Sequence, residues 1–295
     1  MSFLSRLFTR NQPVEAEAPG VPAVPETETA SSLPAAPAAE DPFPAPVEEP
    51  VAQALAEDEA LAEAVLRSVE RHQAGRAIQE AARIARQFQG TNAVLPLMTA
   101  LRRLSEAGGT PWKDSERASV EKAIGEAIRV ARASVDHFDW LAELSKDPSP
   151  TVRRYAMWKL GDLGDVATEA LVEGLRDPDD TVRIWTAEAL GPTSARDLRR
   201  ARPLIAALED RRSLVRARAA TALARLLVRA TTGAGYGNTV APSAELVADA
   251  MAALGRALDE ERARQDGPGL VEAGEAGIAA RDIAEAVRHI SEAKP

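Results

Sequence analysis

The stretch "DPSPTVRRYAMWKL" at residues 147–160 is followed by "DPDDTVRIWTAEAL" at 177–190 and by "DRRSLVRARAATAL" at 210–223. In each copy an Asp is followed by Val five positions later, by Arg six positions later and by Leu thirteen positions later. The copies are offset by 30 and then by 33 residues. A period of about 20 to 50 residues indicates an array of two-helix units, each of which buries its apolar face only against its neighbours.

A short apolar segment precedes each copy and supplies the other half of the unit. These segments are "WLAEL" at 140–144, "ALVEGL" at 170–175 and "PLIAAL" at 203–208, and each ends two or three residues before the Asp. Pro148 and Pro178 then fall between the two helices, where a missing backbone N–H costs nothing. Each unit is therefore predicted to be a helix, a tight turn and a second helix.

The second helix of each unit is expected to place its Val, and the Leu eight residues later, on the inward face. Small residues on the same helix let neighbouring helices approach closely. The inward and small residues are Val152, Val182, Val215, Leu160, Leu190, Leu223, Ala156, Ala187, Ala219 and Ala220. The turn Asp and the helix Arg have the spacing to pair either within a repeat or between repeats, which predicts a polar ladder along the array.

The pattern L-x-D-P-x-x-x-V-R-x-x-A-x-x-x-L-G resembles the HEAT-like repeat of the type first associated with phycobilisome bilin lyases. The residues that carry the resemblance are Asp147, Pro148, Val152, Arg153, Ala156, Leu160 and Gly161 in the first copy, Asp177, Pro178, Val182, Arg183, Leu190 and Gly191 in the second, and Asp210, Val215, Arg216 and Leu223 in the third. The third copy departs from the pattern, with Arg211 for the proline and Ala224 for the glycine. The resemblance implies an α-solenoid whose motif residues build the fold, and such a fold serves many functions.

Composition agrees with an all-α chain. Aromatic residues are only 4% of the 295 residues, and the apolar content is dominated by Ala, Leu and Val. The absence of Cys excludes disulfides and thiolate nucleophiles. No stretch approaches the roughly 18 continuous apolar residues of a spanning helix, and the N-terminus lacks the apolar core of a secretory signal. We therefore expect a cytoplasmic protein, placed peripherally at the inner face of the membrane if its N-terminus binds lipid.

Five regions are predicted along the chain. Residues 11–50 hold ten of the 20 prolines and eight acidic residues with no Lys or Arg, which is typical of a disordered linker. Residues 51–138 are predicted to be N-terminal helices that form capping or degenerate repeats, residues 139–230 the HEAT-like repeats, and residues 231–295 a C-terminal helical cap. The helices expected in the N-terminal part are 52–73, 75–88, 92–107 and 115–138, the last with Asp114 or Ser115 as its N-cap.

The first ten residues, "MSFLSRLFTR", differ from the linker that follows them. On a helix their apolar side chains gather on one side, with two Arg along one flank, which is the layout of an interfacial helix. The candidate membrane or docking residues are Phe3, Leu4, Arg6, Leu7, Phe8 and Arg10. The same layout suits a docking peptide for a partner protein, and an N-terminal segment without a role is the plainer alternative.

Two features of the repeats make a candidate binding surface. Trp158 and Trp185 fall on successive second helices and could line a groove, although a Trp at such spacing is more often part of the core between repeats. Residues 196–229 hold ten Arg against three acidic residues, which suits an anionic partner or else a face paired within the chain. The candidate surface residues are Trp158, Trp185, Arg199, Arg200, Arg218, Arg225 and Arg229.

No catalytic, cofactor-binding or metal-binding residues are predicted. The "DHFD" at 136–139 is interpreted as a helix end, because a helix turns these side chains to different faces. The glycine-rich "TTGAGYGN" at 231–238 has no preceding strand and no following Lys-Ser or Lys-Thr, so it is interpreted as a loop and not as a phosphate site.

The favoured function is a non-enzymatic, protein-binding adaptor or scaffold, held at a membrane surface or on a partner by its N-terminal peptide. The expected partners are a protein on the solenoid surface and, as a second attachment, an anionic membrane. The first alternative is a bilin lyase-like or other ligand-binding protein with a groove at Trp158 and Trp185. The second, less favoured, is a nucleic-acid binder that uses the Arg196–Arg229 cluster. The sequence does not identify the partner or the oligomeric state.

Overall fold

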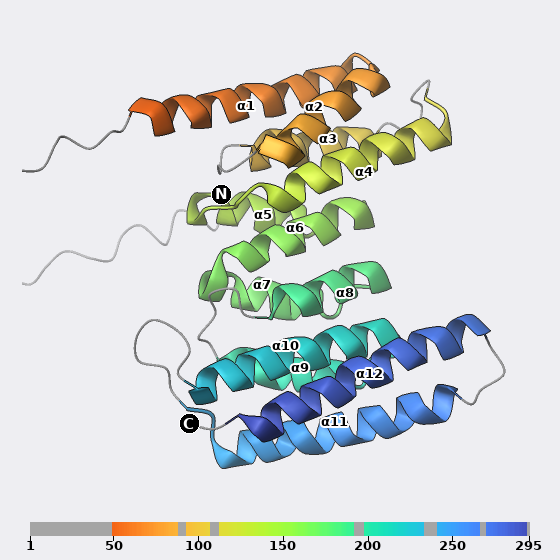
Figure 1. Cartoon of the computed structure of the whole chain (residues 1–295). Coiled ribbons are helices and arrows are strands. Elements are labelled where there is room, and N and C mark those ends of the chain that lie inside the picture. The colour runs from red at the N-terminus through yellow and green to blue at the C-terminus, as the bar shows by residue number, and fades with distance from the viewer. Residues whose placement is uncertain are drawn as a thin grey trace, which may run out of the picture. The chain divides into compact units, whose positions relative to one another are not determined.

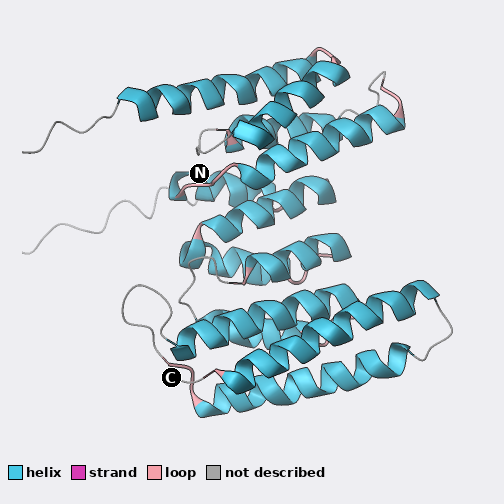
Figure 2. Ribbon diagram, in the orientation of Figure 1, coloured by secondary structure: helices cyan, strands magenta, loops and turns pink. Residues whose placement is uncertain are grey.

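The computed structural model describes residues 49–87, 93–106, 112–191, 198–232, 241–265 and 270–293. In these ranges all regular structure is helical and no strand occurs (Figure 2). The N-terminal peptide and all but the last two residues of the predicted linker lie outside the described residues. Among the helices that are described, none is long and apolar enough to cross a membrane.

Residues 47–295 form one compact unit, whose helices pair along the chain as antiparallel neighbours. In chain order the pairs are α1 (Glu49–Glu70) with α2 (Ala74–Gln87), α3 (Val94–Glu106) with α4 (Asp114–Val130), α5 (Phe138–Leu144) with α6 (Pro150–Asp162), α7 (Thr168–Gly174) with α8 (Asp180–Ala189), α9 (Ala201–Ala207) with α10 (Ser213–Thr232), and α11 (Ala244–Gln265) with α12 (Leu270–Glu292). Short 3₁₀ turns precede α5, α7 and α9, at Val135–His137, Gly164–Ala167 and Leu198–Arg200.

The second helices of successive pairs lie side by side (Figure 1). Helix α2 packs on α4, α4 on α6, α6 on α8, α8 on α10 and α10 on α12. This arrangement confirms the α-solenoid of helical hairpins that the sequence period predicted, and it continues on both sides of the three recognised copies. The interpretation of the flanking pairs as capping or degenerate repeats stays a prediction.

The inward positions of the repeat are buried as predicted. The Val and Leu positions of all three copies, and the small residues between them, are closed to solvent, namely Val152, Val182, Val215, Leu160, Leu190, Leu223, Ala156, Ala187, Ala219 and Ala220. Gly161, which follows the Leu of the first copy, is required for close packing of two helices. A Cβ atom on Gly161 would lie 3.0 Å from the Cβ of Ala189 and 3.2 Å from its Cα, so α6 and α8 approach closely only because this Cβ is absent.

The predicted polar ladder runs between repeats. The guanidinium of Arg153 donates to both carboxylate oxygens of Asp177 at 2.8 Å, and that of Arg183 donates to both oxygens of Asp210 at 2.8 and 3.1 Å. Each Arg also donates to backbone carbonyls in the turn of its own repeat. The hydrogen bond to its Asp raises the pKa of each guanidinium. Each Arg therefore fastens its own turn and holds the turn of the next repeat.

The ladder is closed at both ends by residues outside the motif. On one side Arg102 of α3 pairs with Asp147, with 3.1 Å between Arg102 Nε and the carboxylate. On the other side Arg216 pairs with Glu261 of α11, which takes the place of the next turn Asp. The side chains of Arg216 and Glu261 are 1% and 0% exposed, so this last pair lies in the interior.

The helix predicted at 115–138 is shorter than expected. It ends at Val130, because the backbone of Ala131 turns to an extended conformation (φ −63°, ψ 137°). The buried ammonium of Lys159 donates to the freed carbonyl of Ala131 and to the carboxylate of Asp162, and it thereby holds the bend. Sequence reasoning missed this end because the residue that fixes it lies in the next hairpin.

The beginning of the same helix also differs by one position. Helix α4 begins at Asp114, and its N-cap is Lys113 rather than the expected Asp114 or Ser115. The backbone N–H of Lys113 donates to the carboxylate of Glu116 at 3.1 Å. An acidic residue three positions into a helix is a common way to satisfy this group, and here it replaces a capping side chain.

Candidate binding surface

Two positions of the repeat, eight and eleven residues after the turn Asp, lie one helical turn apart and on a different face from the inward Val and Leu. They hold Tyr155 and Trp158 on α6, Trp185 and Glu188 on α8, and Arg218 and Thr221 on α10. These helices are neighbours, so the positions form two parallel rows across them. We call this surface, with the arginines beside it, the aromatic–arginine stripe, and it consists of Arg129, Arg154, Tyr155, Trp158, Trp185, Glu188, Arg218 and Arg225.

Trp185 lies at the centre of the aromatic part of the stripe. Its ring centroid is 5.3 Å from that of Tyr155 and 5.3 Å from that of Trp158, with interplanar angles of 64° and 71°. These are edge-to-face contacts, which stabilise a pair of aromatic rings by more than the burial of their apolar area alone. The two Trp therefore lie together as their sequence offset suggested, but the rings touch and leave no slot between them for a planar ligand.

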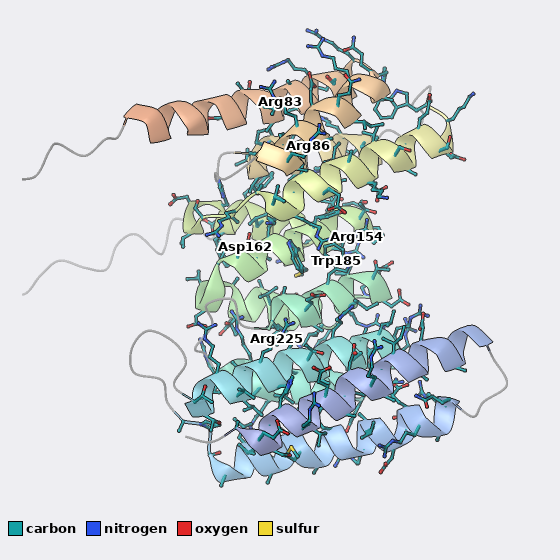
Figure 3. All side chains as sticks on the ribbon, viewed as in Figure 1. Arg83, Arg86, Arg154, Asp162, Trp185 and Arg225 are labelled. Carbon is teal, nitrogen blue, oxygen red and sulfur yellow. The ribbon has the colours of Figure 1, made fainter. Side chains whose placement is uncertain are left out.

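Arginine side chains cover the faces of these rings. The guanidinium carbon of Arg154 lies 5.0 Å from the ring centroid of Tyr155 and 5.7 Å from that of Trp185. Arg129 of α4 lies 5.8 Å from the ring centroid of Trp158. These distances are within the range of cation–π attraction. Figure 3 shows Arg154 and Trp185 side by side on adjacent helices.

The position of Tyr155 depends on a glycine in the neighbouring helix α4. A Cβ atom on Gly125 of α4 would lie 1.8 Å from the Oη of Tyr155, so the phenol occupies the space that this glycine leaves. Burial raises the pKa of the Tyr155 phenol, and the nearby guanidinium of Arg154 opposes that shift. The phenol therefore stays neutral up to a higher pH than a free tyrosine, and it anchors the aromatic part of the stripe.

The Arg cluster of the sequence divides into several environments. Arg218 lies 3.6 Å from the carboxylate of Glu188, and both side chains are partly exposed. Arg225 is exposed and makes no hydrogen bond or ion pair with any residue that the structure describes; Figure 3 shows it on α10. Arg229 is half-buried and has a partner within the chain. Of the cluster, Arg218 and Arg225 thus continue the stripe from α8 onto α10.

Arg200 does not belong to a surface, and its expected place there was wrong. Its side chain is buried, with 1% exposed, and its Nε donates to the hydroxyl of Thr168 at 2.9 Å. Its other nitrogens donate to the backbone carbonyls of Gly164 and Leu190, so it ties the turn before α7 to the end of α8. Arg199 does lie on the surface, 3.5 Å from the carboxylate of Glu169.

Most other arginines of the cluster are paired within the chain. The pairs are Arg202 with Asp249, Arg212 with Glu275 and Asp180, and Arg216 with Glu261. Arg196 lies outside the described residues. The excess of Arg over acids in this sequence window is therefore largely balanced by acids from other helices, which favours the paired face over a nucleic-acid interface.

Beyond α10 the stripe ends at acidic side chains of α12. A hollow between α10 and α12 is lined by Arg218 and Arg225 on one side and by Asp282, Glu285 and His289 on the other. His289 Nε2 lies 3.7 Å from the carboxylate of Glu285. No group of three His, Asp or Glu side chains able to hold a metal occurs in the described parts of the chain. The carboxylates of α12 thus mark the end of the basic surface.

Sequence reasoning missed four members of the stripe, namely Arg129, Arg154, Tyr155 and Glu188. Tyr155 and Arg154 were available, because Tyr155 occupies the same repeat position as Trp185 and Arg154 directly precedes it. Arg129 and the supporting Gly125 belong to α4, which precedes the three recognised copies and carries none of the motif. The N-terminal candidates Phe3, Leu4, Arg6, Leu7, Phe8 and Arg10 lie outside the described residues.

Comparison with known proteins identifies the repeats. The family profile described as HEAT repeats matches residues 113–191 and 138–224, so this part of the chain, less than half of its length, is similar to HEAT repeats. No curated protein matches the chain. The crystal structure of an engineered protein is 20% identical, with 76% of this chain and 97% of that one covered and a TM-score of 0.33. An archaeal HEAT-like repeats protein from Thermococcus onnurineus NA1 is 16% identical, with 71% and 98% covered and a TM-score of 0.26.

Proposed function

We propose that this chain, whose central residues are similar to HEAT repeats, is a non-enzymatic scaffold that binds a protein partner on the aromatic–arginine stripe. The observation that carries the proposal is the stripe itself. Consecutive second helices place partly exposed Trp and Arg side chains together, around the buried ring of Tyr155. Trp and Arg are among the residue types enriched at the energetic centres of protein interfaces.

A scaffold is favoured over an enzyme because the motif residues are occupied in packing the core and in pairing neighbouring repeats. Val152 and Leu160 are in the core, and Arg153 is engaged by Asp177 and by its own turn. What differs between the copies is the position eight residues after the turn Asp, which holds the buried Tyr155 and then the partly exposed Trp185 and Arg218. Variation at outward positions on a fixed framework is how repeat arrays acquire their binding surfaces.

Photo-crosslinking tests the partner. With a photo-crosslinking amino acid in place of Glu188, within the stripe, we expect a covalent adduct with a protein in cells. The matched control carries it at Val166, which is 54% exposed and lies outside the stripe. Adducts are identified by mass spectrometry, and a partner must be enriched at Glu188 over Val166. The same adducts from both positions, or none from Glu188, would argue against a protein-binding stripe.

We also propose that the N-terminal peptide delivers the scaffold to an anionic membrane, as a peripheral protein at the inner face. The proposal rests on the amphipathic layout of residues 1–10 and on the 38 residues between them and α1. A Pro-rich segment of that length spans up to about 120 Å in the polyproline II conformation. Ten residues bind a surface weakly alone, so recruitment by several copies or by a partner would strengthen the attachment.

Liposome flotation tests this delivery. The full chain is expected to float with vesicles that contain anionic lipid and not with neutral vesicles, whereas a chain lacking residues 1–10 is expected to stay at the bottom. Arg6→Gln/Arg10→Gln should weaken flotation because cations near anionic headgroups contribute about 1 kcal/mol each. Ser2→Gln/Ser5→Gln is the matched control. Equal flotation of the full and the shortened chain would contradict a membrane role for this peptide.

A further inference from the structure

We propose that the aromatic–arginine stripe recognises an acidic, extended segment of a partner protein that carries an aromatic side chain. The inference rests on the proposed function, to which it adds the chemistry of the partner. The stripe offers two kinds of contact, cationic at Arg129, Arg154, Arg218 and Arg225, and aromatic at Trp158 and Trp185. A ligand that satisfies both must carry separated negative charges and an apolar ring.

The spacing of the cations suits an extended chain. The arginines stand on α4, α6 and α10, with the two Trp on α6 and α8 between them. Packed helices lie about 8–10 Å apart. An extended chain advances about 3.3 Å per residue, so its every third residue advances about 10 Å. Carboxylates three positions apart would therefore meet Arg129 on α4 and Arg154 on α6. The next third position would bring an apolar ring to Trp185 on α8, and the one after it a carboxylate to the arginines of α10.

The arginines can exchange their present partners at little cost. Arg129 lies 3.8 Å from Glu126 and Arg218 lies 3.6 Å from Glu188, and all four side chains are about half-exposed. Exposed ion pairs contribute little net free energy, because water screens the charges and both side chains lose freedom when they pair. Arg225 has no partner to exchange among the described residues. A carboxylate from a partner, desolvated beside an aromatic surface, would bind these guanidinium groups more strongly than their own exposed pairs do.

Arg154 is held by contacts within the chain and is partly open to solvent. Its Nη2 donates to Glu121 at 3.0 Å, its Nε is buried without an acceptor among the described residues, and 25% of its side chain is exposed, so a partner's carboxylate would bind at the exposed part of the guanidinium. Its guanidinium carbon also lies within cation–π distance of two rings, 5.0 Å from the centroid of Tyr155 and 5.7 Å from that of Trp185. An arginine fixed in this way loses little side-chain entropy when it binds a carboxylate, so we expect Arg154 to contribute most of the electrostatic recognition.

The charge pattern favours an acidic protein segment over a nucleic acid. Three glutamates, Glu121, Glu126 and Glu188, lie among the arginines, and Asp282 and Glu285 of α12 close the end of the stripe. A nucleic acid carries a phosphate at every nucleotide and would bring negative charge against these carboxylates. An acidic segment with neutral residues between its charges can meet the arginines and pass the glutamates by.

The test is a titration of the full chain against a labelled probe peptide. The probe is a twelve-residue peptide of Pro and Ala with Glu at positions 1, 4 and 10 and Phe at position 7, and its binding is followed by fluorescence anisotropy. Arg154→Gln is expected to weaken binding about tenfold, since a charge-assisted hydrogen bond and its stacking are worth about 1.4 kcal/mol or more. Arg225→Gln should weaken binding less, and Arg67→Gln on α1, half-exposed and outside the stripe, should leave it unchanged.

One further variant of the chain and one altered probe serve as controls. Trp185→Phe retains an apolar ring and should bind more weakly than the wild-type chain because the larger indole is lost, while circular dichroism verifies that each variant is folded. A probe with Gln in place of every Glu is expected to lose binding, and binding of the Glu probe should weaken as salt is added.

Several outcomes would overturn the inference. These are the absence of probe binding at millimolar concentration, equal binding of the Gln probe, or unchanged binding to Arg154→Gln. Tighter binding of a twelve-nucleotide single-stranded DNA that depends on the same arginines would assign the surface to nucleic acid instead. If Glu188 crosslinks a protein but the acidic probe does not compete for it, the scaffold function stands and only the acidic chemistry fails.

Discussion

Replacing Glu261 by alanine is expected to lower the free energy of unfolding by about 3–5 kcal/mol, because it leaves the charge of Arg216 buried without its partner. Both side chains are closed to solvent, and the guanidinium donates to Glu261, to the carbonyl of Asp210 and to the hydroxyl of Ser213. Without the carboxylate the positive charge cannot reach water unless α10 and α11 separate. The loss should therefore appear as a large shift of the urea midpoint with an unchanged denaturant slope.

Two variants make this experiment specific. Glu63→Ala removes a pair of the same chemistry, Glu63 with Arg67, whose side chains are 53% and 51% exposed, and it should cost about 0–1 kcal/mol. The double variant Arg216→Met/Glu261→Leu removes both charges and should recover much of the stability, since apolar residues of similar volume often replace a buried pair without loss. Equal losses of unfolding free energy for Glu261→Ala and Glu63→Ala would show that burial of the Arg216–Glu261 pair does not increase the cost of removing one partner.

Leu160→Ala is expected to lower the free energy of unfolding by about 2–5 kcal/mol, the usual range for a leucine deleted from a packed core. Leu160 is completely buried and belongs to α6, which packs against α5, α7 and α8. The cavity cannot collapse easily, because Gly161 already brings α6 to within van der Waals contact of α8. Three helices would have to shift together to fill it.

The measurement is again chemical denaturation, followed by circular dichroism. Leu95→Ala is the matched control, because Leu95 is 44% exposed on α3, and its loss should cost less than about 1 kcal/mol. A result in which Leu160→Ala and Leu95→Ala are equally mild would mean that the repeat core is loosely packed, contrary to the close approach at Gly161.

The fold was predictable because its signal lies within single repeats. The offsets from Asp147, Asp177 and Asp210 to Val, Arg and Leu are local, and burial of those positions follows from helical geometry. The direction of the ladder was not predictable, since the spacing allows Arg153 to reach either its own Asp147 or the Asp177 of the next repeat. Only the packing of one hairpin on another decides this, and Asp177 takes the carboxylate contact.

The candidate surface was predictable in part for the same reason. The adjacency of Trp158 and Trp185 follows from their repeat positions, whereas the cation over Trp158 comes from Arg129 on a helix that carries no motif. The error at Arg200 has a related origin. A count of arginines along the chain cannot tell a side chain that donates to Gly164 and Leu190 carbonyls from one that faces water.

The direction of the ladder also fixes how an array of this kind could change in length. Every interior rung joins an Arg to the Asp of the following repeat, while the two outer rungs use Arg102 and Glu261, which lie outside the three copies of the motif. A repeat added beyond either end would find no free donor or acceptor. A repeat inserted next to the unit that carries Asp177 and Arg183 would find an Arg partner on one side and an Asp partner on the other. The ladder is therefore closed at both ends, and duplication of a central unit would lengthen it without leaving an Arg or an Asp unpaired.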